Sequence, residues 1–406
     1  MGPSRPTILQ IIPELDTGGA ELSAIEIAEA VVLAGGRAIV LSEGGRMADR
    51  LAKTGAELVP FPAATKNPWK LATNAIAIER IVRRENVDLI HARSRAPAWS
   101  ALAAARRAKR PFVTTYHGIY SEKGRAKRLY NSVMARGDIV IANSQYTADI
   151  VKQRYAIPAD RIRVIYRGVA LDAFDPEVVS QERIETLRRK WGLTSGQHVV
   201  LHAARLTRWK GQTDVIAAAA RMRDKARNWV FILAGDSQGR DDYQNALLSQ
   251  ITEAGVQDIV RLVGHVEDMP AAFGAARIAI VASIEPEAFG RAAAEAQAMG
   301  CPVISTNIGA PPETVLAPPR VSTSDRTGWL VSPGKLSDYE DALAEAFSLD
   351  ESDHASMGRR ARRHVTRAFS TFEMQRATLA VYDSLLKTRM EQQFVDASSS
   401  GIVQNV

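Results

Sequence analysis

The sequence predicts an α/β protein made of two doubly wound parallel sheets, each with its own core. The chain has 406 residues, more than one ordinary core usually accommodates. Short apolar runs typical of strands alternate with helical stretches from end to end, which favours parallel sheets. A charged stretch without strand character, residues 171–192, separates two such series. We therefore expect the interdomain linker there.

The first series begins close to the N-terminus and extends to about residue 166. Helical stretches are expected between its strands, for example over residues 20–34 and 96–108. Strands are predicted at residues 7–12, 37–41, 58–61, 89–91, 112–115, 139–142 and 163–166.

The second series follows the linker and ends in a long helix. Strands are predicted at residues 199–203, 229–234, 259–263, 278–282, 302–305 and 329–331. Ser370-Thr371-Phe372-Glu373 is a capping-box pattern that begins the last good helix, residues 370–388. Its apolar stripe at helical spacing is Phe372, Leu379, Tyr382 and Leu386.

These boundaries predict an N-terminal domain over residues 1–185 and a C-terminal domain over residues 190–369. The tail, residues 391–406, has few periodic apolar residues and a Ser-rich run, so we expect it to be mobile. Two doubly wound sheets that face each other leave a deep cleft outside the carboxyl ends of their strands. Ligands are expected in this cleft.

The composition excludes several classes of protein. Hydrophobic residues make up 46% and charged residues 24%, a soluble globular balance. The single cysteine, Cys301, excludes a disulfide framework and a cysteine-built metal site, and it fits a reducing cytosol. We find no signal-peptide pattern and no apolar run long enough to span a bilayer. We therefore expect a cytoplasmic protein.

Positive charge is concentrated in the first half of the chain. Residues 61–136 hold 16 Lys and Arg against 4 Asp and Glu, a net charge of +12, with Trp69 and Trp99 among them. Such a segment suits a membrane surface or an anionic glycolipid. A solvated basic face is the simpler interpretation. Nucleic acid is disfavoured because no nucleic-acid-binding module accompanies the charge.

Two carboxylates, Glu287 and Glu295, stand across the start of a probable helix between two predicted strands. Their oxygens can accept hydrogen bonds from sugar hydroxyls. If the segment were helical throughout, eight residues would separate them by about 12 Å. Glycosidase carboxylates lie at most about 9.5 Å apart, so this pair does not predict a glycosidase. Two ordinary helix glutamates remain the simpler alternative.

Three further groups follow predicted strands. Arg205 and Lys210 flank a turn after the first strand of the second half, where fixed cations can stabilise a departing diphosphate. Gly18 and Gly19 follow the first strand, and their backbone can approach a ligand closely. His117 follows another strand in Tyr116-His117-Gly118, although a lone histidine is more often structural.

No Asp-x-Asp pair and no His, Cys, Asp and Glu cluster with metal-ligand spacing occurs in the sequence. We therefore expect no metal and no cofactor. If the reaction releases a diphosphate, Arg205, Lys210 and the helix N-terminus near Gly290 would stabilise its charge in place of a metal ion.

Together these motifs resemble the retaining GT-B glycosyltransferases that are similar to family 4, including bacterial lipopolysaccharide core mannosyl- and hexosyltransferases. The likeness is carried by the Glu-x7-Glu motif of Glu287 and Glu295, by Arg-x4-Lys-Gly at Arg205, and by the Gly-Gly and His-Gly loops. It implies two Rossmann-like domains with a deep interdomain cleft. It also implies that the last helix crosses back to the N-terminal domain.

The resemblance implies a role for each motif. Glu287 contacts the donor sugar, Glu295 contacts the nucleotide ribose, and Arg205 and Lys210 hold the diphosphate. His117 lies at the donor sugar or the reacting centre. The remaining donor-binding candidates, which act largely through backbone, are Gly18, Gly19, Gly235, Val266, Ala288, Phe289 and Gly290. Arg167 departs from the family, which often has asparagine at this place.

The resemblance therefore implies a metal-independent, retaining hexosyltransferase. The donor expected is GDP-mannose, with a UDP-hexose as the alternative. The acceptor expected is an anionic membrane glycolipid of lipopolysaccharide core biosynthesis, bound at the cytoplasmic face of the inner membrane through the basic N-terminal domain. Two other functions stay open: a GT-B scaffold that only binds nucleotide or glycan, and a sugar-nucleotide epimerase.

Overall fold

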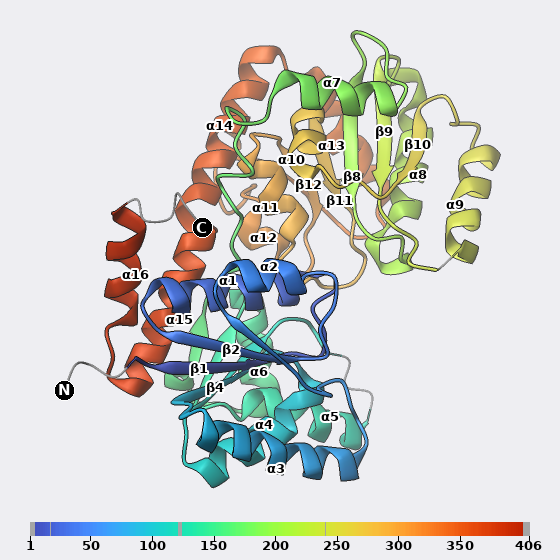
Figure 1. The fold of residues 1–406 in the computed structure, drawn as a ribbon. Helices are drawn as coiled ribbons and strands as arrows, with labels where there is room; N and C mark the ends of the chain where they lie inside the picture. Colours follow the sequence, from blue (N-terminus) through green and yellow to red (C-terminus); the bar gives the residue numbers. More distant parts are fainter. Residues whose placement is uncertain (1–4, 17, 121–123, 240, 401–406) are drawn as a thin grey trace. The chain divides into compact units, whose positions relative to one another are not determined.

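The structure is a computed structural model that describes residues 5–16, 18–120, 124–239 and 241–400. The chain forms two compact units (Figure 1). Unit 1 contains the chain up to Gly168 and again from Thr371 onward, and unit 2 contains Val169–Ser370. In the part of the chain described, no helix is long and apolar enough to cross a membrane.

Unit 1 is built on a seven-stranded parallel sheet with the order β3-β2-β1-β4-β5-β6-β7. All five residues of β1 are buried, which is typical of a parallel strand covered on both faces. The strands are β1 (Thr7–Ile11), β2 (Arg37–Ser42), β3 (Glu57–Pro60), β4 (Leu89–Ala92), β5 (Phe112–Tyr116), β6 (Ile139–Ala142) and β7 (Ile162–Val164).

Helices cover both faces of this sheet because successive strand residues point to opposite sides. Ile8 packs into a core with α1, whereas Leu9 packs into a core with α3 and α4. Figure 1 shows α1 on one side of the sheet and α3 and α4 on the other. The elements between the strands are α1 (Gly19–Leu33), α2 (Ala48–Lys53), α3 (Pro68–Arg84), α4 (Arg95–Ala108), α5 (Arg125–Asn131), η1 (Ser132–Ala135), α6 (Gln145–Tyr155) and η2 (Ala159–Arg161).

The C-terminal helices belong to unit 1. Helix α15 (Thr371–Leu386) packs on α1 and includes buried Leu379 and Tyr382. Helix α15 therefore lies in the same compact unit as the N-terminal strands. His91 in β4 lies between two hydroxyls, Tyr382 Oη at 2.6 Å and Thr115 Oγ1 at 2.7 Å, and so links α15 to the sheet.

The expectation of a mobile tail from residue 391 is wrong for the described residues. They form a further helix, α16 (Met390–Ser399), that packs on α1 and α15. Met390 and Phe394 are buried, and the Phe394 ring stacks on Phe372 with centroids 5.3 Å apart. These two side chains, four residues apart, lie on one face of the helix and enter the core of unit 1. Residues 401–406 lie outside the described residues.

Unit 2 contains a second parallel sheet of six strands with the order β10-β9-β8-β11-β12-β13. Both sheets are thus Rossmann-like, as predicted. The strands are β8 (His198–Ala203), β9 (Trp229–Ala234), β10 (Val260–Gly264), β11 (Ile278–Val281), β12 (Val303–Thr306) and β13 (Gly328–Val331).

Helices again surround the sheet of unit 2. One core includes residues of α8, α9 and α13, while α10 and α11 contact β8 and β11. The elements are α7 (Gln181–Lys190), η3 (Arg208–Lys210), α8 (Gln212–Met222), η4 (Arg223–Lys225), α9 (Asp241–Glu253), α10 (Met269–Ala275), α11 (Arg291–Ala298), α12 (Pro311–Thr314), η5 (Thr323–Asp325), α13 (Leu336–Ser348) and α14 (Glu351–Ala368).

The division between the units comes earlier in the chain than residue 185, the end expected for the N-terminal domain. Helix α7 lies inside the expected linker but packs on α10 of unit 2. Arg183 of α7 pairs with Asp268 at 2.7 Å, and the Ile184 side chain lies against Gly274. These contacts assign the charged stretch to unit 2.

Candidate active site

The predicted residues of unit 2 gather at one edge of its sheet. Arg205 and Lys210 follow β8, Gly235 follows β9, and Glu287 follows β11, and these three strands are neighbours. Because the sheet is parallel, their carboxyl ends meet at the same edge. Residues far apart in sequence are thereby placed in one site.

The centre of this site is an ion pair between Lys210 and Glu287. The Nζ of Lys210 lies 2.6 Å from Oε1 of Glu287, and both side chains are largely buried, with 17% and 10% exposed. Ser283 donates a hydrogen bond to the same carboxylate oxygen. Lys210, the residue predicted to bind the diphosphate, is therefore in direct contact with Glu287, the residue predicted to bind the sugar.

Backbone contacts between two loops hold this pair in place. The N–H of Ile284 donates to the Trp209 carbonyl at 2.8 Å, which joins the loop after β11 to η3. Gly211, with φ of +73°, lies so close to Ala282 that a Cβ there would overlap the Ala282 carbonyl oxygen. Only glycine fits at this position, and this close approach brings Lys210 to Glu287.

The surroundings keep Glu287 ionised. Burial alone would raise the pKa of this carboxyl, but the charge and hydrogen bond of Lys210, together with the Ser283 hydroxyl, lower it overall. Lys210 also lies 4.2 Å from the ring centroid of Trp209, a cation–π contact. His202, just behind them, is neutral because burial lowers its pKa to about 4.

The segment from Glu287 to the helix is not helical. Glu287 forms a parallel bridge with Gly309, and its carbonyl accepts a hydrogen bond from Ala310 at 2.9 Å. Helix α11 begins only at Arg291, after Gly290 adopts φ of +83°. The separation of about 12 Å, which assumed a continuous helix, therefore does not apply to Glu287 and Glu295.

The other residues of this motif are also placed by the turn before α11. The Phe289 side chain is buried and packs edge-on against Phe369, with centroids 5.5 Å apart, so only its backbone can serve a ligand. Glu295 pairs with Arg291 at 2.6 Å within α11. The first N–H groups of α11, which follow Ala288 and Gly290 in the chain, lie at the same edge of the unit 2 sheet as Glu287.

Arg205 differs from Lys210 in having no acidic partner within the described residues. It is exposed, while its carbonyl accepts a hydrogen bond from Gln212. Its guanidinium is therefore available to an anion. Arg208, to which the sequence assigned no role, lies over the ring of Tyr243 at 5.6 Å.

Gly235 and Val266 occupy the neighbouring loops after β9 and β10. The N–H of Gly235 donates to the Gly264 carbonyl at 2.8 Å, and a Cβ at Gly235 would overlap the Ala204 carbonyl oxygen. Val266 is buried. Gly235 thus shapes this edge through its backbone.

In unit 1 the candidates His117, Gly18 and Gly19 follow β5 and β1 at the carboxyl edge of that sheet. Helix α1 begins at Gly19, with Gly18 as its N-cap and no side-chain cap. Thr17, beside them, lies outside the described residues. The first turn of α1 also contains Glu21, whose carboxylate lies beside Gly18.

The tautomer of His117 follows from its contact with Arg167. Nη2 of Arg167 lies 3.1 Å from Nδ1 of His117 and 3.2 Å from its carbonyl oxygen. A guanidinium has no acceptor, so Nδ1 must accept and the ring proton of the neutral imidazole is on Nε2. Nε2 is buried and has no hydrogen-bond partner among the described residues. The pKa of His117 is well below its usual value, mainly because the ring is buried. The positive charges of Arg167 and Arg93 lower this pKa further.

Several residues that shape these sites were not found from the sequence. Ser283 and Trp209 lie within four residues of the groups that they contact, whereas Arg167 reaches His117 from the loop after β7. The departure from asparagine at Arg167 was the only signal for it. No cluster of three or more His, Cys, Asp or Glu that could hold a metal occurs among the described residues.

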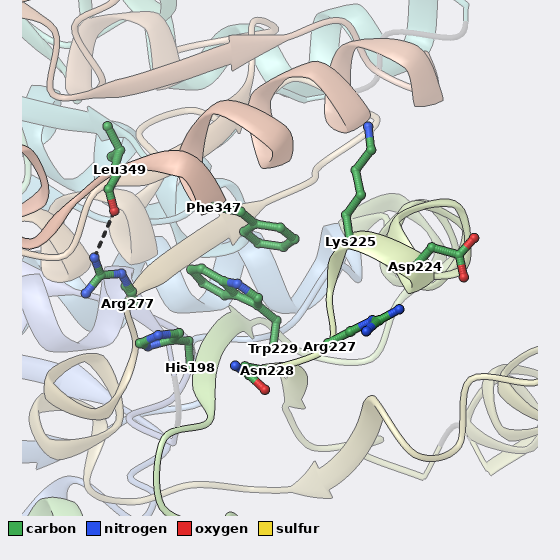
Figure 2. Close-up of a pocket in the computed structure, with 9 residues that line it drawn as sticks. All are labelled: His198, Asp224, Lys225, Arg227, Asn228, Trp229, Arg277, Phe347 and Leu349. Carbon is green, nitrogen blue, oxygen red and sulfur yellow. Dashed lines mark hydrogen bonds between the residues drawn. The ribbon is translucent and has the colours of Figure 1, made fainter.

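A separate cavity of about 280 Å³ lies at the opposite, amino-terminal ends of β8 and β9 (Figure 2). The Trp229 and Phe347 rings stack at its centre, with centroids 4.0 Å apart. Arg277 at its edge donates to the Leu349 carbonyl. No predicted site residue lines this cavity, and it is not part of the candidate active site.

Known proteins match both halves of the chain. Residues 17–173 match Glycosyltransferase Family 4, and residues 183–364 match Glycosyl transferases group 1. A glycosyltransferase structure from Rickettsia africae ESF-5 is 33% identical, with a TM-score of 0.87 over 95% of this chain and 100% of that one.

Two further relatives carry names that include a ligand. The structure of Anabaena Alr3699/HepE in complex with UDP-glucose is 27% identical, with a TM-score of 0.80 over 93% of this chain and 100% of that one. The D-inositol 3-phosphate glycosyltransferase of Arthrobacter sp. (strain FB24) is 30% identical over 73% of this chain and 71% of its own length.

Proposed function

Since the chain belongs to the GT-B glycosyltransferases, with a family 4 region followed by a group 1 region, it transfers a sugar from a nucleotide sugar, and we propose that it does so with retention of configuration and without a divalent metal. The observation that carries the proposal is the buried contact of Lys210 with Glu287 at one sheet edge, beside Arg205, which has no acidic partner among the described residues.

The donor is proposed to bind unit 2. The diphosphate takes over part of the ion-pair contact that Lys210 makes with Glu287 in the absence of donor. Arg205 provides a second cation for the diphosphate. Glu287, ionised and held by Ser283, accepts hydrogen bonds from sugar hydroxyls. Glu295 is the proposed ribose ligand, which requires its contact with Arg291 to rearrange or to be shared.

The chemical step breaks the bond between the anomeric carbon and the diphosphate oxygen and forms one to the acceptor oxygen. The electron pair of the broken bond stays on the diphosphate, which also receives the acceptor's proton. The developing charge is stabilised by Lys210, Arg205 and the helix N-terminus after Gly290. Loss of one such group costs on the order of 3 kcal/mol in the barrier.

The donor sugar is proposed to be a hexose. The sequence favours GDP-mannose, whereas the UDP-glucose complex of the Anabaena relative supports a UDP-hexose. The backbone positions Gly235 and Val266 near the proposed base provide no side-chain contact that discriminates guanine from uracil. The two donors are therefore competing versions of one proposal.

The acceptor is proposed to be anionic and to bind unit 1. The +12 segment, residues 61–136, lies in this unit, and the name of the Arthrobacter relative includes a phosphorylated inositol. An anionic glycolipid such as the lipopolysaccharide core, at the cytoplasmic face of the inner membrane, is the specific acceptor proposed.

A panel of nucleotide sugars tests this function. Thermal unfolding with GDP-mannose, UDP-glucose and ADP-glucose should show a rise in Tm with one base class, because ligand that binds the native state stabilises it. Transfer or slow hydrolysis of that donor should persist in EDTA. A donor that raises the Tm but is neither transferred nor hydrolysed would identify a non-catalytic binding scaffold, and an isomerised sugar nucleotide would identify an epimerase. If no donor raises the Tm, the proposed function fails.

Turnover of a Lys210→Ala variant tests the assigned site. It should fall about 100-fold or more, while donor binding persists through the remaining groups. Lys335→Ala, which removes an exposed lysine of the same unit paired with Asp338, is the control and should leave turnover unchanged. Near-normal turnover of Lys210→Ala would contradict the proposed role.

A further inference from the structure

We propose that a cavity in unit 1 binds a phosphate group of the acceptor, so that the acceptor is a phosphorylated sugar or polyol. This inference rests on the proposed function and specifies its acceptor. The cavity encloses about 540 Å³, within the size range of small-molecule sites. It is lined by Pro13, Ala64, Lys66, Ser94, Arg95, Ala96, Ile119, Tyr120, Lys127 and Tyr130.

The cavity lies at the functional edge of the unit 1 sheet. Pro13 follows β1, Ser94 follows β4, and Ile119 follows β5 only two residues after His117. The strands β1, β4 and β5 are neighbours in the sheet order. A ligand in this cavity is therefore at the edge where doubly wound sheets bind their ligands.

The charged side chains that line the cavity are all positive among the residues that the structure describes. Lys66, Arg95 and Lys127 face the cavity, and no described carboxylate lines it. None of these three cations has an ion-pair partner in the described part of the chain. A cavity with three uncompensated cations attracts an anion.

Some other cations of the same basic segment are paired with carboxylates. Arg83 and Arg107 both pair with Glu79, and Arg106 pairs with Asp138 at 2.9 Å. Lys70, Arg80, Lys109 and Arg125 also lack an ion-pair partner among the described residues. What distinguishes Lys66, Arg95 and Lys127 is that all three line one cavity.

Arg95 is held ready for a ligand. Its Nη1 donates to Oδ1 of the buried Asn131 at 2.8 Å, and its Cζ lies 3.9 Å from the ring centroid of Tyr120. These contacts fix the guanidinium plane while leaving most of its five N–H donors unused. Such preorganisation lowers the entropy lost when a phosphate is bound.

The start of α4 adds main-chain donors to the same cavity. Ser94 is the N-cap but its side chain makes no capping bond, and the N–H groups of Arg95 and Ala96 belong to the first turn. Pro97 has no N–H, so these two are the donors at this end. Three cations and two N–H groups match the three oxygens of a phosphate monoester better than the two of a carboxylate.

Calorimetric titration of the full-length protein tests the site. D-inositol 3-phosphate should bind at least about tenfold more tightly than unphosphorylated myo-inositol, and more weakly as salt rises. Arg95→Gln and Lys66→Gln should each weaken phosphate binding by about tenfold and leave myo-inositol binding unchanged. Arg84→Gln removes an arginine paired with Glu85 outside the cavity and should have no effect.

Two arms distinguish the source of the phosphate. The first arm uses soluble D-inositol 3-phosphate, and the second uses vesicles with and without phosphatidic acid, a lipid phosphate monoester. Sensitivity to Arg95→Gln in the soluble arm indicates a free sugar or polyol phosphate. Sensitivity only in the vesicle arm indicates a lipid-borne phosphate. Arg95→Lys, which keeps the charge, should retain more binding than Arg95→Gln.

The result that overturns this inference is phosphate binding in neither arm, or binding that ignores both Arg95→Gln and Lys66→Gln. Donor binding by the same proteins separates this failure from failure of the proposed function. If a nucleotide sugar still raises the Tm of each variant, the transferase proposal stands and only the acceptor site is refuted. If no nucleotide sugar binds the unaltered protein, the transferase proposal itself fails.

Discussion

At the scale of single residues, Lys210 and Glu287 depend on each other. Each would be costly to bury alone, and together they share a 2.6 Å contact that also involves Ser283. A site that must receive a diphosphate needs a cation that is already desolvated and oriented. In the absence of donor, the Glu287 carboxylate keeps Lys210 desolvated and oriented. It then remains in place to contact the donor sugar.

The pair predicts how stability depends on pH. In the unaltered protein the pKa of Glu287 is lowered, so its stabilising contribution is present above its unfolded value of about 4.5 and is lost as pH falls through the folded pKa. In Lys210→Ala, burial is no longer opposed and the pKa of Glu287 should rise. The variant should lose about 3–5 kcal/mol near pH 7.

Thermal unfolding between about pH 7 and pH 5 measures this. Because the neutral carboxyl is easier to bury, the difference in Tm between Lys210→Ala and the unaltered protein should shrink as the pH falls. Lys335→Ala breaks an exposed pair with Asp338, and its Tm should change little at any pH. A constant difference for Lys210→Ala would show that Glu287 is not the group that titrates.

Arg167 predicts a measurable tautomer at His117. With Arg167 present, the imidazole should stay neutral through physiological pH with its proton on Nε2. Arg167→Met removes the donor to Nδ1 and a nearby positive charge, so the two tautomers should mix and the pKa should rise. Nitrogen-15 NMR of the imidazole reports both changes.

Arg167→Lys is the control for this experiment, because a lysine keeps the charge and can still donate to Nδ1. Retention of the Nε2–H tautomer in Arg167→Met would contradict the positioning role. If His117 orients the donor sugar through Nε2–H, Arg167→Met should lower kcat more than it raises KM, since a misoriented sugar still binds.

At the scale of elements, helix α16 shows that a short polar helix can be part of a domain core. Only Met390 and Phe394 are buried along it, but both enter the core that contains α1 and α15. Helix α15 is in turn tied to the sheet through Tyr382 and His91. The C-terminal helices therefore stabilise unit 1, although they follow the whole of unit 2 in sequence.

Phe394→Ala should destabilise the protein by about 3–5 kcal/mol, because it deletes a buried aromatic ring and leaves a cavity. Urea unfolding followed by a probe in unit 1 measures the loss. Gln393→Ala changes the exposed neighbour on the same helix and should have little effect. An unchanged urea midpoint for Phe394→Ala would mean that α16 is not docked.

At the scale of the whole molecule, charge is divided unevenly along the chain. Residues 1–190 carry a net charge of +10 and the remainder −3. Unit 1 also exposes large apolar side chains in its basic segment, namely Trp69 (84%), Leu129 (59%) and Ile76 (43%). Exposed tryptophan beside lysine and arginine is the composition expected of a surface that meets an anionic membrane.

Vesicle co-sedimentation tests this surface. The protein should bind vesicles that contain anionic lipid, and binding should weaken as salt is raised. Trp69→Ala should reduce binding several-fold, whereas Leu248→Ala, an exposed apolar residue of unit 2, should not. Binding that is independent of lipid charge would remove the membrane from the proposal.

Much of the fold could be predicted from the sequence because parallel strands buried on both faces are nearly continuous apolar runs. Strands β6 and β9 have the predicted bounds, while β7 begins one residue earlier and ends two residues earlier than predicted. Strand ends depend on pairing with neighbours, which a local pattern does not contain. Helix α16 was missed because its burial rests on two side chains.

The sequence by itself determined two parallel sheets and the placement of the candidate residues after their strands, since both follow from local apolar periodicity and chain order. Only the tertiary structure decided which of these residues meet. Lys210 contacts Glu287 across 77 positions, and Arg167 sets the tautomer of His117 across 50. Such contacts are decided by sheet order and by close backbone approach at glycines such as Gly211, because these bring loops of distant sequence to one edge.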